Sequence, residues 1–224
     1  EFGVVSGWGG LRVTSALVNK YPSVAGQGSG LIVAPGTSEE YPFIYIPGSY
    51  QGWNLNDLNS TIASPNDDGV YEGYVWLGDP TDEFRVAETP NFAGSYGDNN
   101  GDGILVLNSG VNIKAPSPGF YKVDVNLNDL SYSLEKTEWG IIGSATPGGW
   151  DSDTDMTYDA EEGAWVVDVA LMAGEVKFRA NDSWDINFGD DGADALLQQD
   201  GANIIIPGNG NYTIKLYLDK PDYT

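Results

Sequence analysis

Two cations and a tryptophan lie close together in the stretch EVKFRANDSWDINFGDDGADA, residues 175–195. The run VKFRAN reads as a strand, in which successive side chains point to opposite faces. Its apolar residues are expected to enter a core. The alternate residues, Lys177, Arg179 and Asn181, are expected to face solvent beside the loop that carries Trp184. This arrangement places hydrogen-bond donors next to an exposed aromatic face.

Charge and residue types exclude several chemistries. The chain has 224 residues, a formal net charge of −23, and no histidine or cysteine. Disulfides, thiolate or imidazole metal sites, and Ser–His or Cys–His nucleophile pairs are therefore excluded. The acidic surface would repel nucleic acid and anionic lipid headgroups. No cofactor is predicted, and a neutral partner is expected.

One module is repeated along the chain. GFYKVDVNLNDLSYSLEK at 119–136 matches GNYTIKLYLDKPDYT at 210–224, and Tyr121 and Tyr212 are separated by 212 − 121 = 91 positions. Several blocks match in the same order, which chance resemblance does not explain. These blocks are IYIPGSYQGWN with IIGSATPGGWD, DDGVYEGYVWL with EEGAWVVDVAL, and FRVAETPNFAGSYGD with FRANDSWDINFGD. The predicted modules are 41–136 and 137–224.

Each module is predicted to consist of β-strands. YEGYVWL, WVVDVAL and YTIKLYL alternate at period two, and clusters of Gly, Asn, Asp and Pro separate them. The predicted fold class is all-β, with tandem antiparallel β-sandwich modules. Residues 1–40 match neither module. They are interpreted either as the tail of a preceding domain or as a lead-in strand.

The candidate site recurs in both repeats. The matched positions are Trp53 with Trp150, Arg85 with Arg179, and Phe92 with Trp184, while Glu83 stands opposite Lys177. A core requires apolar positions but not a recurring outward arginine, so the recurrence favours a binding surface. The alternative is that the cations are solubilising and the aromatic side chains cover the end of a sandwich. Both Arg85 and Arg179 are predicted to be exposed, and Phe84 and Phe178 to be buried.

Aromatic faces with adjacent hydrogen-bond donors suit a sugar. Pyranose C–H faces stack on indole rings, and sugar hydroxyls accept hydrogen bonds from Arg and Lys and donate to Asn and Asp. Such a ligand needs no net charge, so it is compatible with an acidic protein. In this interpretation the cations act as hydrogen-bond donors rather than as anion traps.

The blocks GSATPGGWD, EVKFRANDSWDINFGDDG and GANI together resemble the SusE/SusF-like outer-membrane glycan-binding proteins of Bacteroidetes. IYIPGSYQGWN with DDGVYEGYVWL resembles another module of the same family. The resemblance covers roughly residues 41–224. It implies a non-catalytic cell-surface lipoprotein of tandem β-sandwich modules that serves glycan uptake, with starch as the best-known ligand.

The resemblance also implies binding sites made of two aromatic residues and adjacent basic residues. Carried onto this chain, they are Trp150, Lys177, Arg179 and Trp184 in the second module, and Trp53, Arg85 and Phe92 in the first. Phe92 and Glu83 depart from the pattern, which puts the first site in doubt. A SusC/SusD-like uptake complex is the implied partner. The lipid-bearing cysteine of such lipoproteins is not in this chain, which is interpreted as a fragment. The resemblance implies a preceding immunoglobulin-like domain, whose tail is one of the two interpretations of residues 1–40.

Three other interpretations receive less support. DNNGDG at 98–103 resembles the start of a calcium loop, but its twelfth position is Ser109 rather than a bidentate Glu, and the second repeat lacks the pattern. No metal site is therefore predicted. A glycosidase would need two carboxylates roughly 5–10 Å apart across a cleft, and no unmatched pair marks one. A spacer module without its own ligand is the main alternative, and it predicts that Trp150 and Trp184 are packed rather than exposed.

Overall fold

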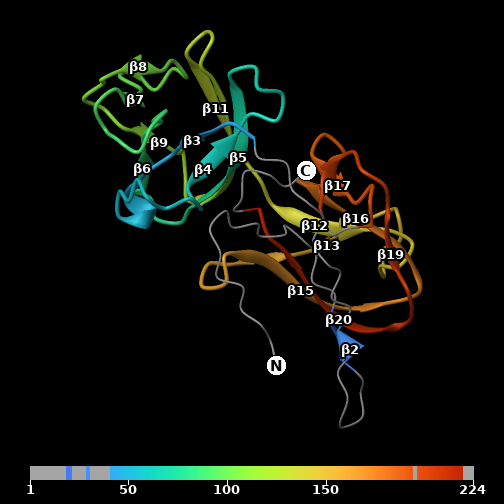
Figure 1. The fold of residues 1–224 in the computed structure, drawn as a ribbon. Coiled ribbons are helices and arrows are strands. Elements are labelled where there is room, and N and C mark those ends of the chain that lie inside the picture. The colour runs from blue at the N-terminus through green and yellow to red at the C-terminus, as the bar shows by residue number, and fades with distance from the viewer. Residues whose placement is uncertain (1–18, 22–28, 31–40, 194–195, 219–224) are drawn as a thin grey trace.

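The computed structural model describes residues 19–21, 29–30, 41–193 and 196–218 (Figure 1). Within these ranges the regular structure consists of β-strands and one 3-10 turn, Ser49–Gln51. All strand pairs in the sheets are antiparallel. The predicted fold class, all-β with antiparallel sandwich modules, is confirmed. The boundary between residues 136 and 137 stays a prediction.

The first group of sheets contains a five-stranded sheet in the order β11-β10-β5-β4-β3. Its strands are β3 (Phe43–Tyr45), β4 (Thr61–Ala63), β5 (Val70–Leu77), β10 (Gly119–Asn126) and β11 (Ser131–Lys136). Two short pairs complete this group: β6 (Glu83–Phe84) with β9 (Ile113–Lys114), and β7 (Tyr96–Gly97) with β8 (Val106–Leu107). Isolated bridges pair Tyr45 of β3 with Ala87, Gly48 with Phe84 of β6, and Val86 with Tyr96 of β7.

The second group contains two larger sheets. One has the order β14-β15-β20-β1-β2, and the other has the order β13-β12-β16-β17-β18 with β19 also paired to β16. The strands of the first are β1 (Asn19–Tyr21), β2 (Ser29–Gly30), β14 (Thr157–Asp159), β15 (Ala164–Leu171) and β20 (Gly210–Leu216). Those of the second are β12 (Trp139–Ile142), β13 (Thr154–Asp155), β16 (Gly174–Ala180), β17 (Asn187–Gly189), β18 (Gln198–Gln199) and β19 (Ile204–Ile206).

The sequence repeat is also a repeat of strand register. Tyr121 of β10 lies opposite Val75 of β5, and Tyr212 of β20 lies opposite Val169 of β15. Each of the two matched tyrosines donates its hydroxyl to the carbonyl four residues earlier, at 2.7 Å for Tyr121 and 2.5 Å for Tyr212. The central strand pair is therefore built in the same way in both copies.

Two strands, β1 and β2, come from the segment that matched neither module. Lys20 of β1 lies opposite Tyr212 of β20, whereas Lys136 of β11 lies opposite Tyr121 of β10. Strand β1 therefore occupies, in the second group, the position that β11 occupies in the first, and Figure 1 shows β2 beside the β20 region. The rest of residues 1–40 and residues 219–224, which include the matched Tyr223, lie outside the described residues.

The predicted alternation along the strands that carry Phe84 and Phe178 is confirmed, but the predicted exposure of the cations is wrong. Phe84 and Phe178 are both 0% exposed, as predicted. Lys177 and Arg179 are only 9% and 7% exposed, and Arg85 is half-buried. The register has not slipped, since the apolar alternates of β16 lie in the core. Instead, loops cover the outer face of the strand as well.

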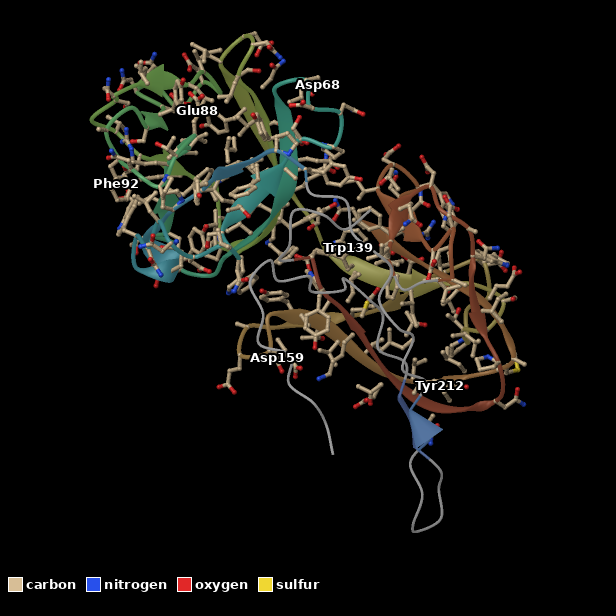
Figure 2. All side chains as sticks on the ribbon, viewed as in Figure 1. Asp68, Glu88, Phe92, Trp139, Asp159 and Tyr212 are labelled. Atoms are coloured by element: carbon tan, nitrogen blue, oxygen red, sulfur yellow. The ribbon has the colours of Figure 1, made fainter. Side chains whose placement is uncertain are left out.

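An aromatic cluster joins the two groups of sheets. Phe120 of β10 contacts Tyr158 of β14 with ring centroids 4.8 Å apart and Trp165 of β15 at 5.7 Å. Tyr74 of β5 contacts Trp139 of β12 at 5.9 Å, and Figure 2 shows Trp139 between the two groups. Such rings bury large apolar areas, and edge-to-face pairs add further stabilisation. The buried core of the second group therefore extends into strands of the first.

Replacement of Phe120 by alanine should destabilise the protein strongly. Phe120 is 4% exposed, and the substitution would leave a cavity among the rings of Tyr74, Tyr158 and Trp165. Buried Phe→Ala changes cost about 3–5 kcal/mol. The matched control is Phe43→Ala, at a phenylalanine that is 42% exposed, and it should cost well under half as much. Denaturant unfolding measures both, and equal losses would show that the cluster is not packed in solution.

Candidate functional site

Two exposed tryptophans lie side by side at one edge of the second group of sheets. Trp150 and Trp184 are 40% and 46% exposed, with ring centroids 6.2 Å apart and ring planes inclined by 35°. Trp150 follows a turn closed by a hydrogen bond from the Gly143 N–H to the Gly149 carbonyl at 3.0 Å. Trp184 lies between β16 and β17, where its carbonyl accepts a hydrogen bond from the Asn187 amide. These two rings are called the tryptophan platform below.

Arg179 packs against one ring of the platform. Its guanidinium carbon lies 4.8 Å from the centroid of the Trp184 ring, a cation–π contact. Its Nε donates to both carboxylate oxygens of Asp153, at 2.8 and 2.9 Å, and its Nη2 lies 2.7 Å from one of them. The Asp153 side chain is 2% exposed. Burial raises the pKa of the Asp153 carboxyl and the nearby Asp182 adds to this, although Arg179 opposes both effects.

Lys177 lies on the same strand face, two residues before Arg179. Burial lowers the pKa of its ammonium, while the negative charges of Asp200 and Asp191 act in the opposite direction. The side-chain ammonium of Lys177 has no hydrogen-bond acceptor or ion-pair partner within the usual distances among the described residues. Its donors are therefore not consumed by those residues.

Asn181 has a different surrounding from the two cations. Its backbone is in the left-handed region at φ 57°. Its amide nitrogen donates to the Lys136 carbonyl at 3.0 Å, and its side-chain oxygen accepts from the Glu138 N–H at 2.9 Å. Asn181 thus ties β16 to the connection between the repeats, and both ends of its side chain are occupied there.

The first repeat brings its matched residues together in a separate pocket. Trp53 and Phe92 contact edge to face, with centroids 6.1 Å apart. Phe92 is 40% exposed, and Figure 2 shows it at the outer edge of the first group. A shallow, largely open pocket of about 460 Å³ lies beside the rings. It is lined by Trp53, Arg85, Phe92, Ser95, Asn108, Ser109 and Asn112.

Sequence reasoning missed the residues that hold the arginines. Asp153 follows Trp150 by three positions, and the sequence analysis does not predict its ion pair with Arg179. In the first repeat, Arg85 is held by Ser95, which accepts from Nε at 2.8 Å and from Nη2 at its carbonyl at 3.2 Å. A buried arginine requires such partners. The sequence signal for this ion pair is the carboxylate of Asp153, three positions after the recurring tryptophan of the second repeat. The first repeat has Asn56 at the matching position.

The DNNGDG loop is held together by its own first aspartate. Asp98, 3% exposed, accepts from the N–H groups of Asn100 and Gly101 at 2.8 Å each, and from Gly103 at 3.0 Å. The Tyr132 hydroxyl donates to it at 2.8 Å. Burial acts to raise the pKa of Asp98, but these four donors outweigh it and lower the pKa below its ordinary value of 3.8. Both carboxylate oxygens of Asp98 are therefore occupied by hydrogen bonds from the loop and from Tyr132.

No cluster of three or more acidic, histidine or cysteine residues that could hold a metal occurs in the described part of the chain. That part also contains no helix with the length and apolarity needed to cross a membrane.

Comparison with known proteins gives little further information. No protein-family model matches the chain, and no curated protein matches it. Among solved structures the chain is similar to one described as the crystal structure of SusF from Bacteroides thetaiotaomicron, with 17% identity and a TM-score of 0.33. The match covers 94% of this chain and 57% of that one. A TM-score this low supports no argument about fold or function, which must be made from the residues themselves.

The role of Asp98 can be tested by Asp98→Asn, with Asp102→Asn in the same loop as the control. Charge-assisted hydrogen bonds contribute about 1.5–3 kcal/mol each, so Asp98→Asn should clearly lower the free energy of unfolding at neutral pH. Because the folded-state pKa of Asp98 is lowered, this contribution is present above pH 3.8 and is lost as the pH falls through the folded value. The gap between wild type and variant should therefore narrow in acid.

Metal removal provides a separate test of the same loop. Because both Asp98 oxygens already accept hydrogen bonds from the protein, a chelator should leave the melting temperature nearly unchanged. Thermal unfolding with and without chelator measures this. A large drop would show that the loop holds a cation.

Proposed function

We propose that the chain binds a polysaccharide or oligosaccharide, starch-like or another glucan, at the tryptophan platform, without catalysing a reaction on it. The observation that carries the proposal is the exposure of Trp150 and Trp184 side by side, with Arg179 fixed beneath one ring by Asp153. Large aromatic side chains are rarely left in solvent as an adjacent pair unless something covers them.

The chemistry of the platform suits a pyranose chain. Successive sugar rings can stack their C–H faces on two adjacent indoles, while the ring hydroxyls accept hydrogen bonds. Lys177 supplies donors from the same strand face. Arg179 restrains the Trp184 ring through the cation–π contact. Because Asp153 neutralises Arg179, the arginine adds no net charge to the surface.

The alternatives receive less support from these contacts. A spacer module predicts packed aromatic loops, whereas both rings of the platform are at least 40% exposed. A glycoside hydrolase needs an available carboxylate pair, and Asp153, the carboxylate that the platform contacts through Arg179, is occupied by its ion pair.

The cellular setting is also part of the proposal. Attachment at the outer surface of the outer membrane through a lipid anchor, and work alongside a SusC/SusD-like uptake complex, rest on the resemblance of the sequence blocks alone. Binding by one platform should be weak, because an open site spends much of its contact energy on ordering a flexible glycan. A dissociation constant on the order of 0.1–1 mM is expected, and many copies on a surface would add avidity.

Trp184→Ala should abolish retardation of the protein in affinity gels that contain an α-glucan or a β-glucan. Each stacked ring contributes about 0.5–1.5 kcal/mol beyond its buried area, so a weak site cannot lose one ring and remain detectable. The matched control is Phe43→Ala, an exposed aromatic far from the platform in sequence, which should leave retardation unchanged. Circular dichroism checks that each variant is folded.

Trp53→Ala should reduce retardation by the same polymers less than Trp184→Ala does, since the first pocket lacks a second tryptophan and the lysine. If neither tryptophan substitution changes retardation across a broad polysaccharide panel, the platform does not bind glycans and the spacer interpretation replaces this proposal.

A further inference from the structure

The two arginine sites differ in charge compensation. Arg179 is neutralised by Asp153, which lies three positions after Trp150. The matching position, three after Trp53, is Asn56. The aligned sequence position in the first repeat therefore carries an amide instead of a carboxylate.

Arg85 is bound by neutral groups. Its Nε donates to the Ser95 hydroxyl, its Nη2 to the Ser95 carbonyl and its Nη1 to the Asn112 side-chain oxygen at 3.2 Å. These bonds use three of the five N–H donors of a guanidinium. Each terminal nitrogen thus keeps one N–H that no described residue accepts. Arg85 also forms no ion pair within the described ranges.

The nearest carboxylate in this network, that of Glu83, already has a positively charged partner. Asn112 donates to Glu83 at 2.7 Å, so it separates Glu83 from Arg85. Glu83 in turn lies 3.5 Å from the Lys114 ammonium. Burial lowers the pKa of Arg85, and no neighbouring acidic group offsets this. The positive charge of Arg85 is therefore uncompensated at the wall of a pocket.

The pocket around Arg85 has the other parts of a sugar site. Its volume is about 460 Å³, and Trp53 and Phe92 contact each other along one side of it. Ser109 and Asn112 already hydrogen-bond within the protein. The side-chain oxygen of Asn108 accepts from the Gly94 N–H at 3.0 Å, and its amide nitrogen can donate to a sugar hydroxyl. An arginine fork recognises a carboxylate through paired N–H donors.

We propose that the pocket of the first repeat binds a carboxylate-bearing sugar, a uronic acid residue of an acidic oligosaccharide, whose carboxylate pairs with Arg85. This inference rests on the proposed function, because it assumes that the aromatic surfaces of the two repeats bind sugars. The overall charge of −23 opposes the approach of an acidic sugar at low ionic strength. At physiological ionic strength charges are screened beyond roughly 8 Å, so groups lining the pocket dominate.

The test follows the indole N–H signal of Trp53 by NMR during titration of the whole chain, with Trp53→Phe to assign that signal. The ligands are an oligogalacturonide and an oligoglucuronide, each compared with its methyl ester, which keeps the sugar and removes the charge. A sulfated neutral oligosaccharide and a neutral gluco-oligosaccharide complete the set. The signals of Trp150 and Trp184 report on the platform in the same spectra.

At least one acid should bind at Trp53 about tenfold more tightly than its methyl ester, because charge-assisted hydrogen bonds are roughly twice as strong as neutral ones. Arg85→Gln should remove this preference, and Arg85→Lys should retain part of it. Raising the salt concentration should weaken acid binding and leave ester binding unchanged.

Several outcomes would overturn the inference. Equal binding of acid and ester, or no shift of Trp53 with any ligand, would show that Arg85 does not recognise a carboxylate. Equal binding of sulfate and carboxylate would show recognition of anions in general. In each case a shift of Trp150 and Trp184 with the neutral ligand would leave the proposed function standing. Absence of that shift, with no polymer retarding the protein, would instead refute the proposed function.

Discussion

The buried ion pair between Arg179 and Asp153 holds the candidate site together. A guanidinium that is 7% exposed is tolerated because a carboxylate accepts three close contacts from it. This pair links strand β16 to the loop after Trp150, and the cation–π contact links it to the loop that carries Trp184. The charged pair therefore contacts the Trp184 ring directly and holds the loop that follows Trp150. Removing either partner would leave a buried charge alone.

Duplication explains why two surfaces exist, and local substitution explains why they differ. The central strand pairs keep the same register, and the same tyrosine-to-carbonyl bond recurs at Tyr121 and Tyr212. Around the arginines the contacts diverge: an ion pair in one repeat, and Ser95 with Asn112 in the other. A common framework with different charges allows one chain to present two surfaces of different preference.

The aromatic cluster between the groups of sheets adds a second constraint. Phe120 and Tyr74 use the face of their sheet that points away from their own core and contact Tyr158, Trp165 and Trp139. These contacts bury apolar surface that a separate module would leave in solvent. The two halves are therefore joined by packing as well as by the chain itself.

The sequence alone determined the strands and their apolar faces, because alternation at period two is a local property that Phe84 and Phe178 display directly. It also determined which aromatic and basic residues recur, and so where the candidate sites lie. Only the tertiary structure decided what covers the other face. Lys177 and Arg179 are buried because loops distant in sequence fold over them, Asn181 is used by the connection between the repeats, and β1 pairs with β20 across most of the chain. These depend on long-range contacts, which no local pattern encodes.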